Sequence, residues 1–112
     1  MRLLVKSGRE SIALRLEEIV LIYTQNKVVY VIDRSSKKYI SDKVLRELEE
    51  ELDRTIFFRA NRQYIVNIDY VKSFKPHEKV KLLINITIPH INHSIIISQL
   101  TAPAFRKWMH DA

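Results

Sequence analysis

The chain has no cysteine and only one glycine, Gly8, among its 112 residues. Without cysteine it can form no disulfide, no thiolate metal site and no thiol nucleophile. A single glycine leaves no glycine-rich loop to hold a phosphate group, which excludes the common nucleotide-binding folds. Its turns must therefore be built mainly from Asn, Asp and Ser, whose side chains bond to nearby backbone.

Long apolar runs are also missing. No stretch approaches the ~20 apolar residues that a membrane-spanning helix requires, and the first ten residues turn polar too soon for a signal peptide. These absences predict a cytoplasmic protein without a membrane partner. Because no linker, repeat or low-complexity segment divides the chain, we expect one folded domain over residues 1–112.

The formal net charge of +6 points to a polyanionic partner. The charge is unevenly distributed, since residues 42–53 hold six acids and two bases, a net charge of −4, which leaves +10 on the remainder. An acidic element beside a strongly basic remainder is typical of a nucleic-acid-binding protein that turns one face away from the phosphates.

Most of the chain has the pattern of short β-strands. Ile12, Leu14 and Leu16 alternate with polar or small neighbours, which is the period of a half-buried strand. Short runs rich in β-branched residues predict further strands at 20–23, 28–32, 38–40, 64–66, 71–74, 80–84 and 94–97. Between two of them, the segment Gln25-Asn26-Lys27 suits a hairpin turn, because Asn tolerates positive φ.

Two segments have helical spacing, at residues 42–53 and 102–110. In the first, Ser41 or Asp42 is the expected cap, and one face carries the apolar residues Val44, Leu45, Leu48 and Leu52. In the second, Thr101 is the expected cap, and the apolar stripe consists of Phe105, Trp108 and Met109.

The first helix is not expected to read DNA. A helix in the major groove lies between phosphates, which would repel Glu47, Glu49, Glu50 and Glu51. We expect this helix to cover a sheet, to turn its acids to solvent and to be dispensable for DNA binding.

No catalytic motif stands out. There is no serine-centred motif and no carboxylate pair with catalytic spacing. His90 and His93 could bring two imidazoles together, but neither a cysteine nor a nearby carboxylate completes a zinc site. We therefore expect neither an enzyme nor a bound cofactor or metal.

The most informative segment is residues 57–67, with the sequence FFRANRQYIVN. It interleaves basic, amide and aromatic side chains directly before an apolar strand. Arg can pair in bidentate fashion with guanine, and Asn or Gln can do so with adenine. Taken alone, the segment fits equally well with Phe57 and Phe58 in a core and with Arg59 and Arg62 as surface charge.

This segment resembles the hallmark of LytTR (LytR/AlgR-type) DNA-binding domains of bacterial response regulators. In that family a Phe, an Arg and a His-Arg-Ser-like triplet precede an Ile/Val-Asn strand. The upstream helix with its Leu-x-x-Leu-x-x-x-Leu spacing and the Ile97-Ser98 pair at the end of the last strand fit the same pattern. The resemblance covers the chain from about residue 3 to 109.

The resemblance implies a mostly β fold of about ten short strands in three stacked antiparallel sheets, with two short helices at the edge. Family members read duplex DNA from loops inserted into successive major grooves, often at direct repeats. They are usually the C-terminal output domain of a two-component response regulator. We therefore expect duplex DNA as partner, a receiver domain on the N-terminal side, and an isolated domain that is monomeric.

The resemblance also implies which residues contact DNA. They are Gln25, Asn26 and Lys27 in the hairpin turn, the triplet Asn61, Arg62 and Gln63, and Ser98 and Gln99 after the last strand. Arg59, two residues before the triplet, is included among the DNA-binding residues, but it alternates with Phe58 and Ala60 on the approach to the strand and is expected to be partly structural. Three of them depart from the family pattern: the usual His is Asn61, the usual Ser is Gln63, and the usual Arg after the last strand is Gln99. Each replacement is polar, so DNA binding is retained as a prediction, while the family's base preferences do not carry over.

Two other interpretations remain open. The chain could be a β-rich protein-interaction or ligand-sensing module with an incidental basic surface. It could also bind single-stranded RNA or DNA on an exposed aromatic sheet, for which some of the five tyrosines are candidates.

Overall fold

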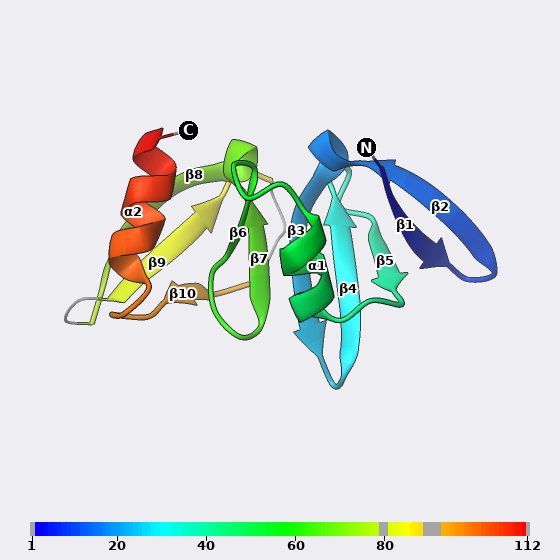
Figure 1. Ribbon diagram of the computed structural model, residues 1–112, viewed down its shortest axis with the longest axis horizontal. Helices are drawn as coiled ribbons and strands as arrows, with labels where there is room; N and C mark the ends of the chain where they lie inside the picture. Colours follow the sequence, from blue (N-terminus) through cyan, green and yellow to red (C-terminus); the bar gives the residue numbers. More distant parts are fainter. Residues whose placement is uncertain (1, 79–80, 89–92, 112) are drawn as a thin grey trace.

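The computed structural model describes residues 2–78, 81–88 and 93–111, which form ten β-strands and two α-helices (Figure 1). Two short 3₁₀-helices lie at Leu16–Glu18 and Ile68–Tyr70. The remaining bounds are β1 (Arg2–Ser7), β2 (Glu10–Arg15), β3 (Ile19–Gln25), β4 (Val28–Asp33), β5 (Lys38–Ser41), α1 (Leu45–Glu51), β6 (Phe57–Arg59), β7 (Tyr64–Asn67), β8 (Val71–His77), β9 (Lys81–Ile86), β10 (Ile95–Ile97) and α2 (Ala102–Asp111).

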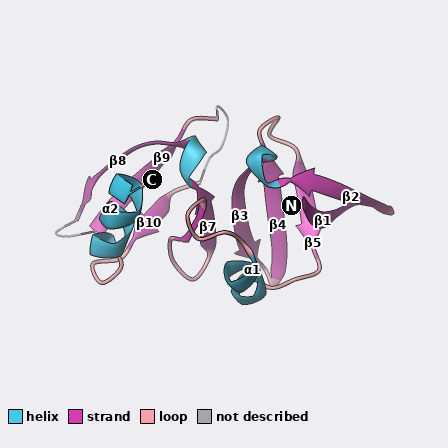
Figure 2. Cartoon of the chain, turned by 45° about the horizontal axis from the view of Figure 1, so that its top comes forward, coloured by secondary structure: helices cyan, strands magenta, loops and turns pink. Residues whose placement is uncertain are grey.

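The strands pair in antiparallel fashion in two sheets (Figure 2). The larger has the order β2-β1-β5-β4-β3-β7-β6, and the smaller has the order β10-β9-β8. The mostly β architecture with two helices is confirmed, although the number of sheets is two and not three. The hairpin of β1 and β2 joins the larger sheet through one residue pair, Lys6 with Ile40, and this bridge merges two expected sheets into one.

Strands β3 and β7 are covered on both faces. Residues 19–23 of β3 and all four residues of β7 are buried. Alternate side chains enter two separate cores: Ile22 and Ile65 pack in the core beneath α1, whereas Leu21 and Val66 pack against the smaller sheet and α2. A strand buried on both faces needs a continuous apolar run, which explains why this part of the sequence does not alternate.

Helix α1 covers the larger sheet with three buried leucines. Leu45 and Leu48 lie within the helix and Leu52 lies directly after it, and they pack with side chains of β1 to β5. Leu48 is completely buried. The predicted leucine face is confirmed, and it fixes the orientation of the acidic residues on the same helix.

The start of α1 differs from the prediction. The helix begins three residues later than expected, and Val44 occupies its N-cap position with 55% of its surface exposed. The prediction of Ser41 or Asp42 as cap was therefore wrong, and Val44, which was placed on the apolar face of the helix, lies before its first turn. The Ser41 hydroxyl instead accepts the backbone N–H of Lys43 at 3.0 Å, which closes a turn before the helix.

Helix α2 closes the second core and confirms the predicted helix at 102–110. Phe105 is completely buried, and its ring packs edge-on against Phe58 and Phe74, with centroid distances of 5.5 and 5.1 Å. The Thr101 carbonyl accepts the N–H of Phe105, so Thr101 stands at the N-cap position as predicted. No helix of the described ranges is long and apolar enough to cross a membrane.

Several strands extend beyond their predicted limits, and β1 and β6 have no predicted counterpart. β1 was not predicted, because three successive apolar residues hide its alternation, in which only Leu4 of residues 3–5 is exposed. β8 runs on through Pro76, which pairs with Leu82 of β9. Proline is tolerated there because β8 is an edge strand, where a missing N–H leaves no sheet partner unpaired. Residue 80 of the strand expected at 80–84 lies outside the described residues.

A buried hydrogen-bond cluster fixes the turn between β4 and β5. The Asp33 carboxylate accepts the backbone N–H groups of Ser35 and Lys37 on Oδ1, and the Tyr39 hydroxyl on Oδ2, each at 2.9 Å. Burial, assisted by the bond to Asp33, raises the pKa of Tyr39 from its ordinary value of 10.0 to about 12. The turn thus depends on one carboxylate and one protonated phenol.

We predict that Tyr39→Phe lowers the free energy of unfolding by about 1–3 kcal/mol, because a buried carboxylate loses one donor. The raised pKa means that Tyr39 stabilises the fold fully below pH 10, and that this contribution is lost as the pH rises toward 12. Urea unfolding of both proteins should therefore differ at neutral pH and converge on alkaline titration. Equal unfolding midpoints at neutral pH would contradict the assigned role of the bond.

Candidate nucleic-acid interface

The three segments implied as DNA contacts lie at one edge of the molecule, the lower edge in Figure 1. They are the β3–β4 turn, the loop between β6 and β7, and the turn after β10. The Gln63 carbonyl accepts the N–H of Thr24 at 3.0 Å, and the Asn61 side chain donates to the Ile96 carbonyl at 2.9 Å. Hydrogen bonds thus connect the middle loop to both of its neighbours.

The β3–β4 turn presents three exposed polar side chains, Gln25, Asn26 and Lys27. Asn26 and Lys27 have φ values of 51° and 66°, as expected for a two-residue turn that follows the twist of its strands. The predicted positive φ at Asn26 is confirmed. Lysine is less stable than glycine in this conformation, so its side chain projects from the tip at a conformational cost.

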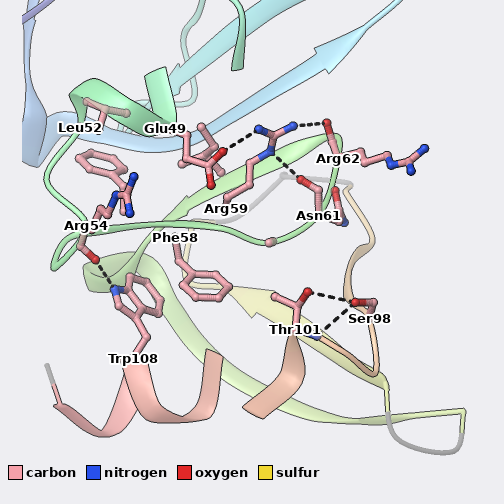
Figure 3. Close-up of a pocket in the computed structure, with 13 residues that line it drawn as sticks. Glu49, Leu52, Arg54, Phe58, Arg59, Asn61, Arg62, Ser98, Thr101 and Trp108 are labelled. Carbon is pink, nitrogen blue, oxygen red and sulfur yellow. Dashed lines mark hydrogen bonds and ion pairs between the residues drawn. The ribbon is translucent and has the colours of Figure 1, made fainter. Parts of the chain in front are cut away.

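Arg59 organises the loop between β6 and β7. Its Nε donates to the Asn61 carbonyl at 2.7 Å, and one terminal nitrogen donates to the Arg62 carbonyl at 2.9 Å. The other terminal nitrogen donates to Glu49 Oε1 at 3.1 Å, which forms an ion pair with α1 (Figure 3). All three bonds of the guanidinium are made within the protein, so Arg59 braces the loop.

The Asn61 side chain is bonded on both of its polar atoms. Its Oδ1 accepts the backbone N–H groups of Gln63 at 2.7 Å and Tyr64 at 3.0 Å, and its Nδ2 donates to Ile96. An amide offers two donors and one doubly accepting oxygen, so three of the four bonds are already made. This geometry gives Asn61 a structural role, whereas a base contact by Asn61 remains a prediction.

Arg62 and Gln63 differ from their neighbours, since both side chains are exposed. The backbone carbonyl of each is bonded, to Arg59 and to Thr24 respectively. The Arg62 guanidinium points away from the other labelled residues of the loop (Figure 3). The loop therefore fixes its backbone and leaves these two side chains outside.

The turn after β10 is closed by its own hydroxyl groups. The Ser98 hydroxyl donates to Thr101 Oγ1 at 3.1 Å, and the Ser98 carbonyl accepts the backbone N–H of Thr101 at 3.1 Å. Ser98 and Gln99 are exposed, as is the apolar Leu100 that follows them. The predicted contact residues of this segment thus lie at the surface, directly before α2.

A cavity of about 740 Å³ lies behind the loop, between α1 and α2 (Figure 3). Phe58 and Trp108 form its apolar part, with ring centroids 5.1 Å apart. The Trp108 indole donates to the Arg54 carbonyl at 2.8 Å, which connects α2 to the segment before β6. Arg59 and Arg62 line the opposite side, so the loop forms one wall of the cavity.

The tyrosines do not provide an exposed stacking surface. All five lie in the described part of the chain, three of them buried and two half-buried, in the order Tyr23, Tyr39, Tyr64, Tyr30 and Tyr70. Single-stranded nucleic acids bind by stacking on exposed rings. None of the five tyrosines that the single-strand interpretation relied on is fully exposed.

His93 packs into this aromatic group. Its Nδ1 lies 2.8 Å from the Tyr64 hydroxyl, and its ring centroid lies 4.4 Å from that of Tyr23. Burial, followed by the charge of Lys38, lowers the pKa of His93 below its ordinary value. His90, the other member of the histidine pair, lies outside the described residues. Within residues 2–78, 81–88 and 93–111 no group of three His, Asp or Glu side chains could hold a metal ion.

Three residues that take part in the bonding at this edge were not predicted from the sequence. Thr24 and Ile96 contribute backbone atoms, which no side-chain pattern reveals. Glu49 was expected to be a solvated acid, yet its carboxylate pairs with Arg59. Nothing distinguishes Glu49 from the neighbouring acids until β6 is placed against α1.

The structure is a β domain of two antiparallel sheets. The predicted contact residues lie on loops that hydrogen bonds connect at one edge, and not on a helix. The chain belongs to the family of LytTr DNA-binding domains, whose model matches residues 9–110. A solved Bacillus cereus structure, described as the LytTr DNA-binding domain of a methyl-accepting/DNA response regulator, matches with a TM-score of 0.82 at 22% identity, over 96% of this chain and 95% of that chain. No curated protein matches.

We predict that the three loop residues separate by their effect on stability. Arg59→Ala and Asn61→Ala should each lower the free energy of unfolding by about 1–3 kcal/mol, since each leaves carbonyl or amide partners without a bond. Arg62→Ala should change it by less than about 0.5 kcal/mol, because the side chain is exposed. Thermal and urea unfolding of the three variants tests this. Equal destabilisation by Arg62→Ala would show that its side chain is part of the brace.

Proposed function

We propose that this protein binds duplex DNA in a sequence-specific manner, as the output domain of a bacterial transcriptional regulator of the two-component response-regulator type. The observation that carries the proposal is the braced loop, which fixes its backbone through Arg59 and Asn61 and leaves Arg62 and Gln63 exposed. Membership of the LytTr DNA-binding family supports it. The domain works by binding and not by catalysis.

The exposed side chains suit different parts of a duplex. Arg62 can pair with the O6 and N7 atoms of guanine, and Gln63 can pair with adenine, when the loop enters a major groove. Lys27, at the tip of its turn, suits a phosphate contact, with Gln25 and Asn26 beside it. At the other end of the edge, Ser98 and Gln99 add neutral polar contacts.

Three further features belong to the same proposal. The binding sites are direct repeats, whose spacing places successive loops in successive major grooves. A receiver domain stands on the N-terminal side in the full-length regulator, and residues 1–112 form one domain that is monomeric by itself. The regulator acts in the cytoplasm, where its DNA is found, and needs no cofactor.

Binding to duplex DNA is expected to weaken steeply with salt, because Lys and Arg release condensed counterions from the phosphates. If four to six phosphates are neutralised, the slope of log K against log salt should be about −4 to −5. Titration of fluorescent duplex and single-stranded oligonucleotides at several salt concentrations measures this slope. Absence of binding at low salt would favour the protein-interaction or ligand-sensing alternative. A preference for single-stranded oligonucleotides would contradict the proposed contact with the major groove of a duplex.

Base reading and phosphate contact are expected to separate between two cations of the edge. Arg62→Ala should weaken binding to the selected operator by about 1–3 kcal/mol and relax the preference at one base pair. Lys27→Ala should weaken all sequences about equally and reduce the salt slope by about one. The measurement is a titration of both variants against the operator and its single-base variants. Full discrimination by Arg62→Ala together with its loss in Lys27→Ala would reverse the two roles.

A further inference from the structure

The acidic helix also carries the Lys43–Glu51 pair, at 2.5 Å with side chains 45% and 41% exposed. The ion pair between Glu49 and Arg59 differs from this pair and from the Arg46–Glu50 pair in the burial of its cation and in the further bonds that the cation makes. Its two side chains are 43% and 24% exposed, whereas those of Arg46 and Glu50 are 85% and 66% exposed with a separation of 4.0 Å. Exposed ion pairs such as Arg46–Glu50 contribute little to the free energy of unfolding. The Glu49–Arg59 pair is shorter than the Arg46–Glu50 pair, at 3.1 Å, and one partner holds two further hydrogen bonds.

Glu49 and Arg59 are each held in place by the helix or strand to which they belong. Glu49 directly follows Leu48, which is completely buried, so α1 cannot rotate without opening the core. Arg59 ends β6, where it pairs with Ile65 of β7. The carboxylate is therefore presented to the guanidinium by a rigid helix, and the guanidinium in turn holds the carbonyls of Asn61 and Arg62.

Glu49 contacts Arg59, and Arg59 contacts the loop carbonyls, so the conformation of the loop depends on Glu49. Among the described residues, Glu49 is the acid that pairs with Arg59, and the two other acceptors of the guanidinium are neutral carbonyls. A charged acceptor gives a shorter and stronger bond than a neutral one. Without the Glu49 carboxylate, the Arg59 guanidinium is better solvated by water than by two neutral carbonyls. The Arg62 carbonyl then loses the hydrogen bond from Arg59 that orients Arg62.

We propose that Glu49 is a positioning residue for DNA recognition, which acts through Arg59 on the orientation of Arg62. The inference rests on the proposed function and deepens it. It also revises the expectation that the whole acidic helix is dispensable for DNA binding. Although the negative charge of Glu49 opposes phosphate binding, Glu49 increases discrimination between sequences. Glu50, whose pair with Arg46 is long and exposed, retains the solvated role.

The test compares Glu49→Ala with Glu50→Ala. Each removes one negative charge from the same helix, so the change in long-range attraction to phosphates is matched. The probes are the duplex that the wild-type protein enriches from a random library and a scrambled duplex of equal length. Dissociation constants for both duplexes, at one salt concentration and well below the melting temperatures, give a discrimination ratio for each protein.

Both variants should bind the scrambled duplex slightly more tightly and to the same extent. Only Glu49→Ala should lower the discrimination ratio, by about tenfold, the factor that corresponds to about 1.4 kcal/mol. Glu49→Gln, which keeps an acceptor oxygen without its charge, should give an intermediate ratio and serves if the alanine variant does not fold. A wild-type ratio in Glu49→Ala or Glu49→Gln, even with a lower melting temperature, would overturn the inference and leave the proposed function intact. Failure of the wild-type protein to enrich any duplex would overturn both.

Discussion

The pairing of β3 with β7, two strands buried on both faces, is the constraint on which the rest of this fold depends. Because the two strands are antiparallel, with Tyr23 opposite Tyr64, the end of β3 and the start of β7 lie at the same edge. The turn after β3 and the loop before β7 are therefore neighbours, which the bond from Thr24 to Gln63 completes. The position of the candidate interface follows from the pairing of the central strands.

The same double burial explains how the smaller sheet contributes to this edge. The face of the central strands that carries Leu21 and Val66 needs a cover, which β8, β9, β10 and α2 provide. That cover brings the end of β10 beside the loop, where Ile96 accepts a bond from Asn61. The second core is thus responsible both for stability and for bringing the third polar segment to the interface.

Much of the fold could be predicted from the sequence, and the exceptions have physical causes. The strands with clear apolar runs and the helix at 102–110 were found, because periodicity reports burial directly. The start of α1 was misplaced, since Ser41 and Asp42 favour turns and caps alike, and the Ser41 hydroxyl is used in a turn. The single bridge between Lys6 and Ile40, which decides whether there are two sheets or three, leaves no periodic signal.

The roles within the loop were harder to predict than its location, because one residue type serves opposite purposes. Arg59 and Arg62 lie three positions apart with the same side chain, yet one is bonded inward and the other is exposed. Asn61, which stands where the family usually has His, accepts two backbone N–H groups on one oxygen and donates from its nitrogen. A neutral imidazole offers one donor and one acceptor, so it could not make all three bonds. The departure at Asn61 therefore has a structural reason: here the amide closes the loop, and the side chains of Arg62 and Gln63 that follow it remain exposed.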